Sequence, residues 1–138
     1  MLNLLIIEEE QNLRNQVKLN FPEIEYNPGK NFDLIVVDCD FNNQSDPIHC
    51  ACVVTSDQQF LHHSKISAEQ VITCGMSEQD TVSYSSLDEL SAQIVLKRAF
   101  FTISKQVILP CEIKISLNAH LSESQNLLFS VLGIFYEK

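Results

Sequence analysis

Apolar residues in the first half of the chain fall in short runs, and each run is closed by acidic or turn-forming residues. The runs are apolar on both faces, which is typical of strands buried inside a parallel sheet. We therefore predict four such strands, at Leu2–Ile7, Phe32–Val37, Ile48–Ser56 and Val71–Cys74.

Helices are expected between these strands. Leu13, Val17 and Phe21 recur at four-residue spacing, and Pro22 ends that element. A short helix is also expected over Gln58–Ile66. Alternating strands and helices indicate a parallel sheet with helices on its faces.

The second half of the chain has a different pattern, with extended segments at Thr81–Leu87, Ile94–Ile103 and Gln106–Leu117. We predict antiparallel strands here, with a hairpin turn at Ser104–Gln106. For residues 90–103 the pattern fits either a strand or a helix, because apolar residues there could also line one face of a helix.

A terminal helix is predicted from a capping signal and an apolar face. Ser122 and Gln125 have the spacing of a capping box, in which each side chain bonds the backbone N–H of the other residue. The apolar face that follows comprises Leu127, Leu128, Val131, Leu132 and Phe135.

These elements predict one α/β domain over residues 1–138. Its expected architecture is a Rossmann-like, mostly parallel sheet flanked by helices, with a C-terminal antiparallel hairpin and a terminal helix. The chain is 45% hydrophobic, so it can bury enough apolar surface to fold. An open edge strand or the hairpin could also support a homodimer.

Charge and cysteine content narrow the class of protein. A formal net charge of −9, with only nine lysines and arginines, disfavours nucleic acid as a partner. Three of the five cysteines lie in apolar runs, the pattern of reduced thiols in a cytoplasmic protein. The N-terminal residues do not have the form of a signal peptide, and the longest apolar run is too short to insert across a membrane.

The sharpest metal candidate is the segment His49–Cys52, in which alternation predicts that Cys50 and Cys52 point to the same side of a strand. We favour core cysteines, because no second Cys or His pair stands at suitable spacing. His62 and His63 are adjacent on the expected helix, so they point apart and do not form a chelating pair. No metal site is expected.

Catalytic motifs are also missing from the sequence. No Gly-x-Ser-x-Gly elbow is present, and with only three glycines in the chain neither a P-loop nor a dinucleotide fingerprint can be written. We therefore expect a protein that is not an enzyme and that has no cofactor.

One alternative is a degenerate receiver domain. In that interpretation Glu8 and Glu9 form the acidic pair, Asp38 is the phosphoacceptor and Thr55 is the switch hydroxyl. The spacing disfavours it, because about 29 residues separate the acidic pair from Asp38 and 17 lead from Asp38 to Thr55, which is too few for the intervening elements.

The segment Val53–Leu87 resembles the second half of the central domain of the Mur ligases. The family has a strand ending in Asn-Ala-Asp-Asp, a strand reading Ile-Thr-Phe-Gly or Ile-Thr-Tyr-Gly, and an Ala-Asp-Val turn. Thr55–Gln58, Ile72–Gly75 and Gln79–Val82 stand in these places. The positions close to the motif are Asp57, Ile72, Thr73, Gly75, Asp80 and His120, and the similar portion spans residues 48–138.

The resemblance implies a Mur-ligase-like module of bacterial type without the ATP-binding half. It places potential ligand-binding residues at Thr55, Asp57, Gly75 and His120, the last matching only the histidine of the family's Gly-x-His-Asn motif. The resulting hypothesis is a non-catalytic binding or interaction module with an unidentified protein partner. The alternative is a sensor of a nucleotide or nucleotide-sugar, with a pocket at the carboxyl ends of the strands.

Overall fold

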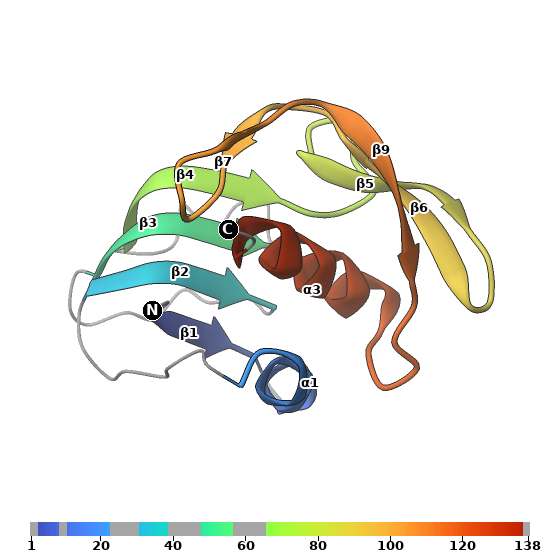
Figure 1. The fold of residues 1–138 in the computed structure, drawn as a ribbon, viewed down its shortest axis with the longest axis horizontal. Coiled ribbons are helices and arrows are strands. Elements are labelled where there is room, and N and C mark those ends of the chain that lie inside the picture. Colours follow the sequence, from blue (N-terminus) through green and yellow to red (C-terminus); the bar gives the residue numbers. More distant parts are fainter. Residues whose placement is uncertain (1–2, 9–10, 23–30, 39–47, 57–65, 137–138) are drawn as a thin grey trace.

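The computed structural model describes residues 3–8, 11–22, 31–38, 48–56 and 66–136 (Figure 1). The first half contains β1 (Leu4–Ile7), α1 (Asn12–Asn20), β2 (Asn31–Val37), β3 (Ile48–Thr55) and β4 (Ile66–Thr73). The second half contains β5 (Val82–Leu87), β6 (Ser91–Leu96), β7 (Phe100–Phe101), β8 (Val107–Ile108), β9 (Cys111–Ser116) and α3 (Glu123–Tyr136). The four predicted parallel strands and the helix after the first strand are present, but β4 begins at Ile66 rather than at the predicted Val71.

The first four strands form a parallel sheet in the order β1-β2-β3-β4. The order follows the chain, so these strands contain no point at which the order reverses, as it does in Rossmann and other doubly wound sheets. The α/β class is therefore confirmed, whereas the Rossmann-like arrangement is not. Of the flanking helices, the described residues contain α1 and α3, and the helix expected over 58–66 lies outside them except for Ile66, which begins β4.

The second half forms two antiparallel sheets, β5-β6-β9 and the hairpin β7-β8. The segment 90–103, for which the sequence fitted either a strand or a helix, is therefore extended. Buried Ile94 and Leu96 alternate with less buried neighbours, which is the two-residue period of a strand. The predicted hairpin turn is confirmed, since the Thr102 N–H donates to the Gln106 carbonyl (2.9 Å). Lys105 in this turn has a φ of 68°, in the left-handed region.

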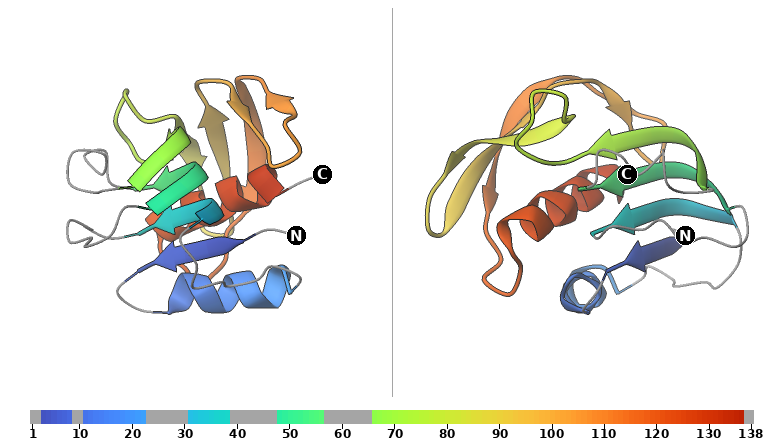
Figure 2. Two further views of the ribbon diagram at one scale, coloured as in Figure 1. Left: turned by 90° about the vertical axis from the view of Figure 1, so that its left-hand side faces the viewer. Right: turned by 180° about the vertical axis from the view of Figure 1, so that it is seen from behind.

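Helix α3 lies between the parallel sheet and the antiparallel strands (Figures 1 and 2). All five residues of its predicted apolar face are buried in the main core cluster, which also includes residues of α1 and of both larger sheets. The predicted capping box is formed, with Ser122 N–H donating to Gln125 Oε1 (3.0 Å) and Gln125 N–H to Ser122 Oγ (3.1 Å). None of the helices in the described part of the chain is long and apolar enough to cross a membrane.

Three neighbouring strands are irregular at the same level, at Asp33, Ala51 and Glu69, which we call the bulge row. The register pairs Phe32 with Cys50 before this level and Leu34 with Cys52 after it. The register is therefore the same on both sides, and the ladder simply lacks a pair between Asp33 and Ala51. Asn3 O accepts from both Asp33 N–H (3.0 Å) and Leu34 N–H (3.3 Å).

The bulge row changes which residues face α3. Phe32 and Cys50 pack in a smaller core cluster on the far face of the sheet. Leu34 and Cys52, two positions further on, pack in the main cluster beneath α3. Side chains at even positions therefore switch faces at the bulge row, which a regular strand would not allow.

The capping box should stabilise α3 measurably. We expect Ser122→Ala to lower the free energy of unfolding by about 0.5–2 kcal/mol, because the Gln125 N–H loses its acceptor. Urea denaturation measures this change. Ser124→Ala, at an exposed position of the same turn, is the control, and equal effects of the two substitutions would contradict a role for the cap.

Candidate ligand-binding cavity

A cavity of about 540 Å³ lies between the bulge row, the β7–β8 hairpin and the C-terminal end of α3. The sheet contributes the bulge row and Gln70, the hairpin contributes Phe101 to Ile103 with Lys105, and α3 contributes Phe135. Phe135 and Thr102 are buried, whereas Phe101 is 52% exposed. The cavity therefore has an apolar base and an opening at the hairpin, and its volume is in the range of small-molecule sites.

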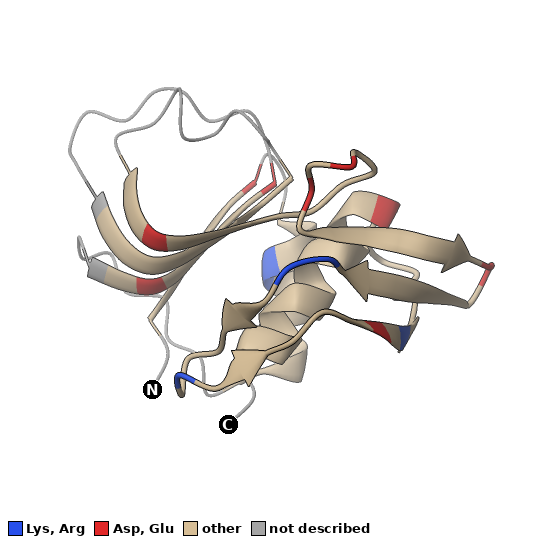
Figure 3. Cartoon of the chain, turned by 90° about the horizontal axis from the view of Figure 1, so that it is seen from above, with Lys and Arg blue, Asp and Glu red and all other residues tan. Residues whose placement is uncertain are grey.

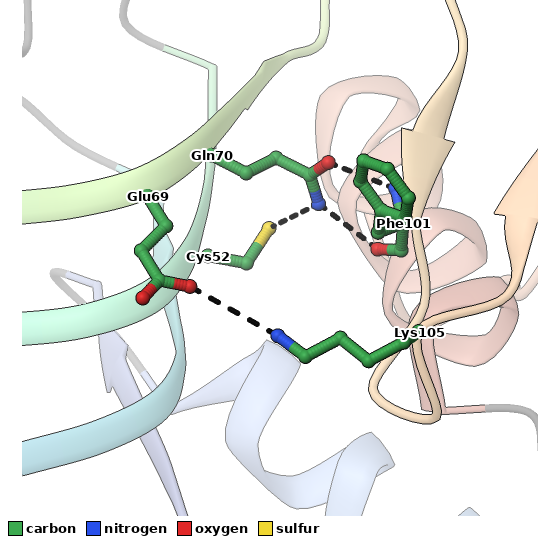
Figure 4. Close-up of polar contacts among 5 residues, drawn as sticks. All are labelled: Cys52, Glu69, Gln70, Phe101 and Lys105. Atoms are coloured by element: carbon green, nitrogen blue, oxygen red, sulfur yellow. Dashed lines mark hydrogen bonds and ion pairs between the residues drawn. The ribbon is translucent and has the colours of Figure 1, made fainter.

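The side chain of Gln70 joins the hairpin to the parallel sheet (Figure 4). Its Nε2 donates to Phe101 O (2.9 Å), and its Oε1 accepts from Phe101 N–H (2.8 Å). The same Nε2 donates to Cys52 Sγ (3.5 Å). The Gln70 side-chain amide thus makes the two hydrogen bonds to Phe101 that a backbone peptide of a neighbouring strand would make. Both N–H groups of this amide donate hydrogen bonds.

A second attachment joins the hairpin to α3, because Ile103 N–H donates to the Phe135 carbonyl (2.9 Å). This carbonyl is in the last turn of α3, where backbone acceptors have no partner within the helix. The hairpin is therefore held at two points, on β4 and on α3, and the cavity lies between them.

Three of the described residues that line the cavity are charged. Lys105 Nζ lies 3.9 Å from Glu69 Oε2, and these side chains are 74% and 77% exposed, so the pair is at the opening and contributes about 0–1 kcal/mol to stability. Asp33 is half-buried, and its Oδ2 accepts from Asn3 N–H (2.8 Å). The lining thus holds two carboxylates and one ammonium group.

The thiols near the cavity are unreactive. Burial raises the pKa of Cys52 to about 12 against a smaller opposing effect of the Gln70 hydrogen bond. Burial and, to a smaller extent, Glu69 raise the pKa of Cys50 to about 12. Both remain protonated at neutral pH, so neither is a ready nucleophile or metal ligand.

The segment His49–Cys52 does not form the predicted one-sided pair. Cys50 packs in the smaller cluster and Cys52 in the main one, so the expectation that they share a side was wrong. The reason is the break in the alternation of faces at Ala51. Within the described residues, no group of three or more His, Cys, Asp or Glu side chains could hold a metal ion.

Three of the residues suggested by the Mur-ligase resemblance, Thr55, Gly75 and His120, are not among the lining residues of the cavity. Thr55, at the end of β3, is fully buried, and its carbonyl accepts from Cys74 N–H (2.9 Å), so Thr55 and Gly75 lie at the same end of the sheet. His120 is exposed in the loop before α3, where its backbone N–H donates to Asn118 Oδ1 (2.9 Å). Asp57 is outside the described residues.

Gly75 has a packing role. A Cβ atom at this position would lie 2.6 Å from Asp80 Oδ2, which also accepts from Ser77 N–H (3.0 Å). The described glycines have no positive φ, so close approach to the Asp80 carboxylate, rather than an unusual turn conformation, requires glycine here.

The carboxylates of the receiver alternative have structural partners. Glu8 accepts from Leu13 N–H and Arg14 N–H (both 3.0 Å) at the start of α1. Asp38 Oδ2 accepts from Gln125 Nε2 (2.9 Å), while Glu9 lies outside the described residues. The strand order also differs from that of receiver sheets, in which the first strand lies between the second and third.

Sequence reasoning missed the cavity residues, although two local signals pointed to them. Asp33 interrupts an apolar run, and Glu69 and Gln70 form a polar pair within a strand. Such polar residues in a buried strand indicate a bulge or a lined cavity. Their convergence with Lys105 and Phe135 depends on long-range packing.

Comparison with protein-family models finds no matching family, and searches of curated proteins and of solved structures return no match. A function for this chain is therefore inferred from the geometry of the cavity.

Loss of the Gln70 amide should loosen the hairpin. In Gln70→Ala, we expect the Phe101 amide proton to exchange with solvent at least about tenfold faster, because it loses the acceptor that protects it. Hydrogen exchange followed by NMR measures this rate. Gln93→Ala, at an exposed position of β6, is the control, and unchanged exchange at Phe101 in the Gln70 variant would contradict the clamp.

The close approach of Gly75 to Asp80 predicts a coupled pair. We expect Gly75→Ala to lower the free energy of unfolding by about 1–3 kcal/mol, because its Cβ displaces the Asp80 carboxylate. In an Asp80→Ala background the same substitution should have a much smaller effect. A double-mutant cycle by urea denaturation tests the coupling, and additive effects would contradict it.

Proposed function

We propose that this chain is a non-catalytic, Mur-ligase-like binding module that takes a small molecule in the cavity beneath the β7–β8 hairpin. The cavity is the observation that supports this function best. It has an apolar base, a few polar groups at defined positions and an opening to solvent, which is the usual form of a small-molecule site.

The lining gives no support to a catalytic role. The Thr102 hydroxyl lies 3.1 Å from Ser104 Oγ and accepts from the Gln106 N–H (3.2 Å), so it is part of the turn. The Cys52 thiol accepts a hydrogen bond from the Gln70 amide, and burial raises the pKa of this thiol. An activated nucleophile needs a neighbouring base or a lowered pKa, and the described lining residues provide neither.

The order of elements supports the proposed relationship to the Mur ligases. The Ile72–Gly75 segment ends β4 and Asp80 comes just before β5, as the resemblance requires. Antiparallel strands and α3 then follow in the family's order. The proposed relationship concerns the module alone, because the sequence has no P-loop.

The nucleotide or nucleotide-sugar alternative has less support in this cavity. Phosphate groups are usually held by Arg or Lys side chains or by free backbone N–H groups. Lys105 is the basic residue among the described lining residues, and it is already paired with Glu69.

A protein-interaction module is the second candidate, favoured by exposed apolar side chains on and beside the hairpin. Phe101 and Val107 are cross-strand partners, each 52% exposed, and Leu109 is 68% exposed. Phe100, the neighbour of Phe101 in β7, is buried. Exposed apolar side chains that cluster in this way often mark a protein contact.

The test of small-molecule binding is a screen of small organic compounds by ¹H–¹⁵N NMR. Binding in the cavity should shift the backbone amides of Thr102 to Lys105, and Ala51→Phe should abolish these shifts by filling the space. Ala119→Phe, at an exposed position before α3, controls for added apolar surface.

Two results would contradict the proposed site. One is a screen in which no compound shifts the hairpin amides of the wild-type protein. The other is full retention of the shifts in a folded Ala51→Phe variant. If compounds fail while a Phe101→Ser, Val107→Ser variant changes the sedimentation of the protein, the interaction module gains the support instead.

A further inference from the structure

We infer that the cavity selects an organic cation, a molecule with an apolar body and a protonated amine. This inference rests on the proposed function and assigns a chemical class to its ligand. It is carried by the charges of the lining and their exposure, together with the positions of two aromatic rings.

The charges of the described residues that line the cavity do not balance. Glu69 on β4 and Asp33 on β2 carry negative charge, and Lys105 in the hairpin turn carries the positive one. In Figure 3, acidic residues mark strands of the parallel sheet, and a basic residue marks the turn of the hairpin across from them. Lys105 pairs with Glu69, so among the described lining residues the carboxylate of Asp33 is the charge without an ionic partner.

Asp33 is well placed to meet a ligand head group. It is held at the bulge row by the bond from Asn3 N–H to its Oδ2, and an ionised carboxylate accepts further hydrogen bonds at its two oxygens. The side chain is half-buried, so a charge there interacts more strongly with a bound cation than it would in open solvent.

The aromatic and aliphatic side chains provide the site for the apolar body. Phe135 is at the base, Phe101 is at the opening, and Ile103 and Ala51 complete the apolar part of the lining. Rings of this kind bury apolar groups and also attract cations to their faces. An ammonium group near Asp33 is therefore attracted both by the carboxylate and by the aromatic rings.

The charge of the whole chain favours the same class of ligand. With 18 acidic residues and nine basic ones, the protein attracts cations over a distance and repels anions. An anionic ligand would be repelled by this field and, inside the cavity, by the Asp33 carboxylate. A neutral ligand would gain from the apolar lining alone.

Three compounds that differ in head-group charge test this inference: 4-phenylbutylamine, 4-phenylbutanol and 4-phenylbutyrate. They share an aromatic body, so differences in affinity report on the head group. NMR titration of the full chain at neutral pH, followed at the hairpin amides, gives the affinities. We expect the amine to bind at least about tenfold more tightly than the alcohol and the carboxylate to bind most weakly.

Substitutions assign the preference to the proposed groups. Asp33→Asn keeps an oxygen to accept from Asn3 N–H but removes the charge, so the amine should lose about tenfold in affinity while the alcohol is unchanged. Lys105→Gln removes the competing cation and should strengthen amine binding. The matched control is Asp88→Asn, at an exposed position in the β5–β6 turn.

Glu69→Gln gives a second test should Asp33→Asn fail to fold, because Glu69 is exposed, and it should also weaken amine binding. The inference is overturned if the three compounds bind equally, if the carboxylate binds most tightly, or if folded Asp33→Asn and Glu69→Gln both keep the amine preference. In those cases the binding function itself still stands. If none of the compounds shifts the hairpin amides, and the wider screen also fails, both proposals fall.

Discussion

The bulge row at Asp33, Ala51 and Glu69 is the constraint on which the cavity depends. In a regular strand, Asp33 would lie on the same face as Ile35, within the smaller apolar cluster. Burying a carboxylate there without a partner would be strongly unfavourable. The break in alternation places Asp33 at the cavity while Leu34 still packs in the main core. The same irregularity therefore positions the polar groups of the site and the apolar side chains beneath the helix.

The hairpin that closes the cavity is joined to the sheet by side-chain chemistry rather than by a strand ladder. The Gln70 amide bonds both backbone groups of Phe101, and one further bond reaches the end of α3. Each such bond contributes about 0.5–1.5 kcal/mol net. The core around α3 rests instead on many buried apolar side chains, each contributing about 1.5–3 kcal/mol. Phe100 of β7 is one of these buried side chains, so opening the hairpin would also expose an aromatic ring to solvent.

Local patterns in the sequence predicted most of the fold and little of the candidate site. The parallel strands, the capping box at Ser122 and the buried face of α3 follow from periodicity and helix-end chemistry, which act over a few residues. The sequential strand order and the bulge row could not be predicted in this way, because they depend on pairing between distant segments. Polar residues such as Asp33 are local signals of the cavity, but their convergence with Lys105 and Phe135 depends on long-range packing.

The carboxyl edge of the sheet is where open α/β folds usually bind phosphates. In this chain the helix N-termini at that edge are already occupied by side chains. Phosphate binding at such an edge uses the free N–H groups at a helix N-terminus. At α1 the Glu8 carboxylate already accepts from two of these groups, and at α3 the capping box and Asp38 engage Gln125. An incoming phosphate would have to displace an anion in one place and a cap in the other. The irregular middle of the sheet, with its unbalanced carboxylate, instead offers a site whose chemistry suits a cation.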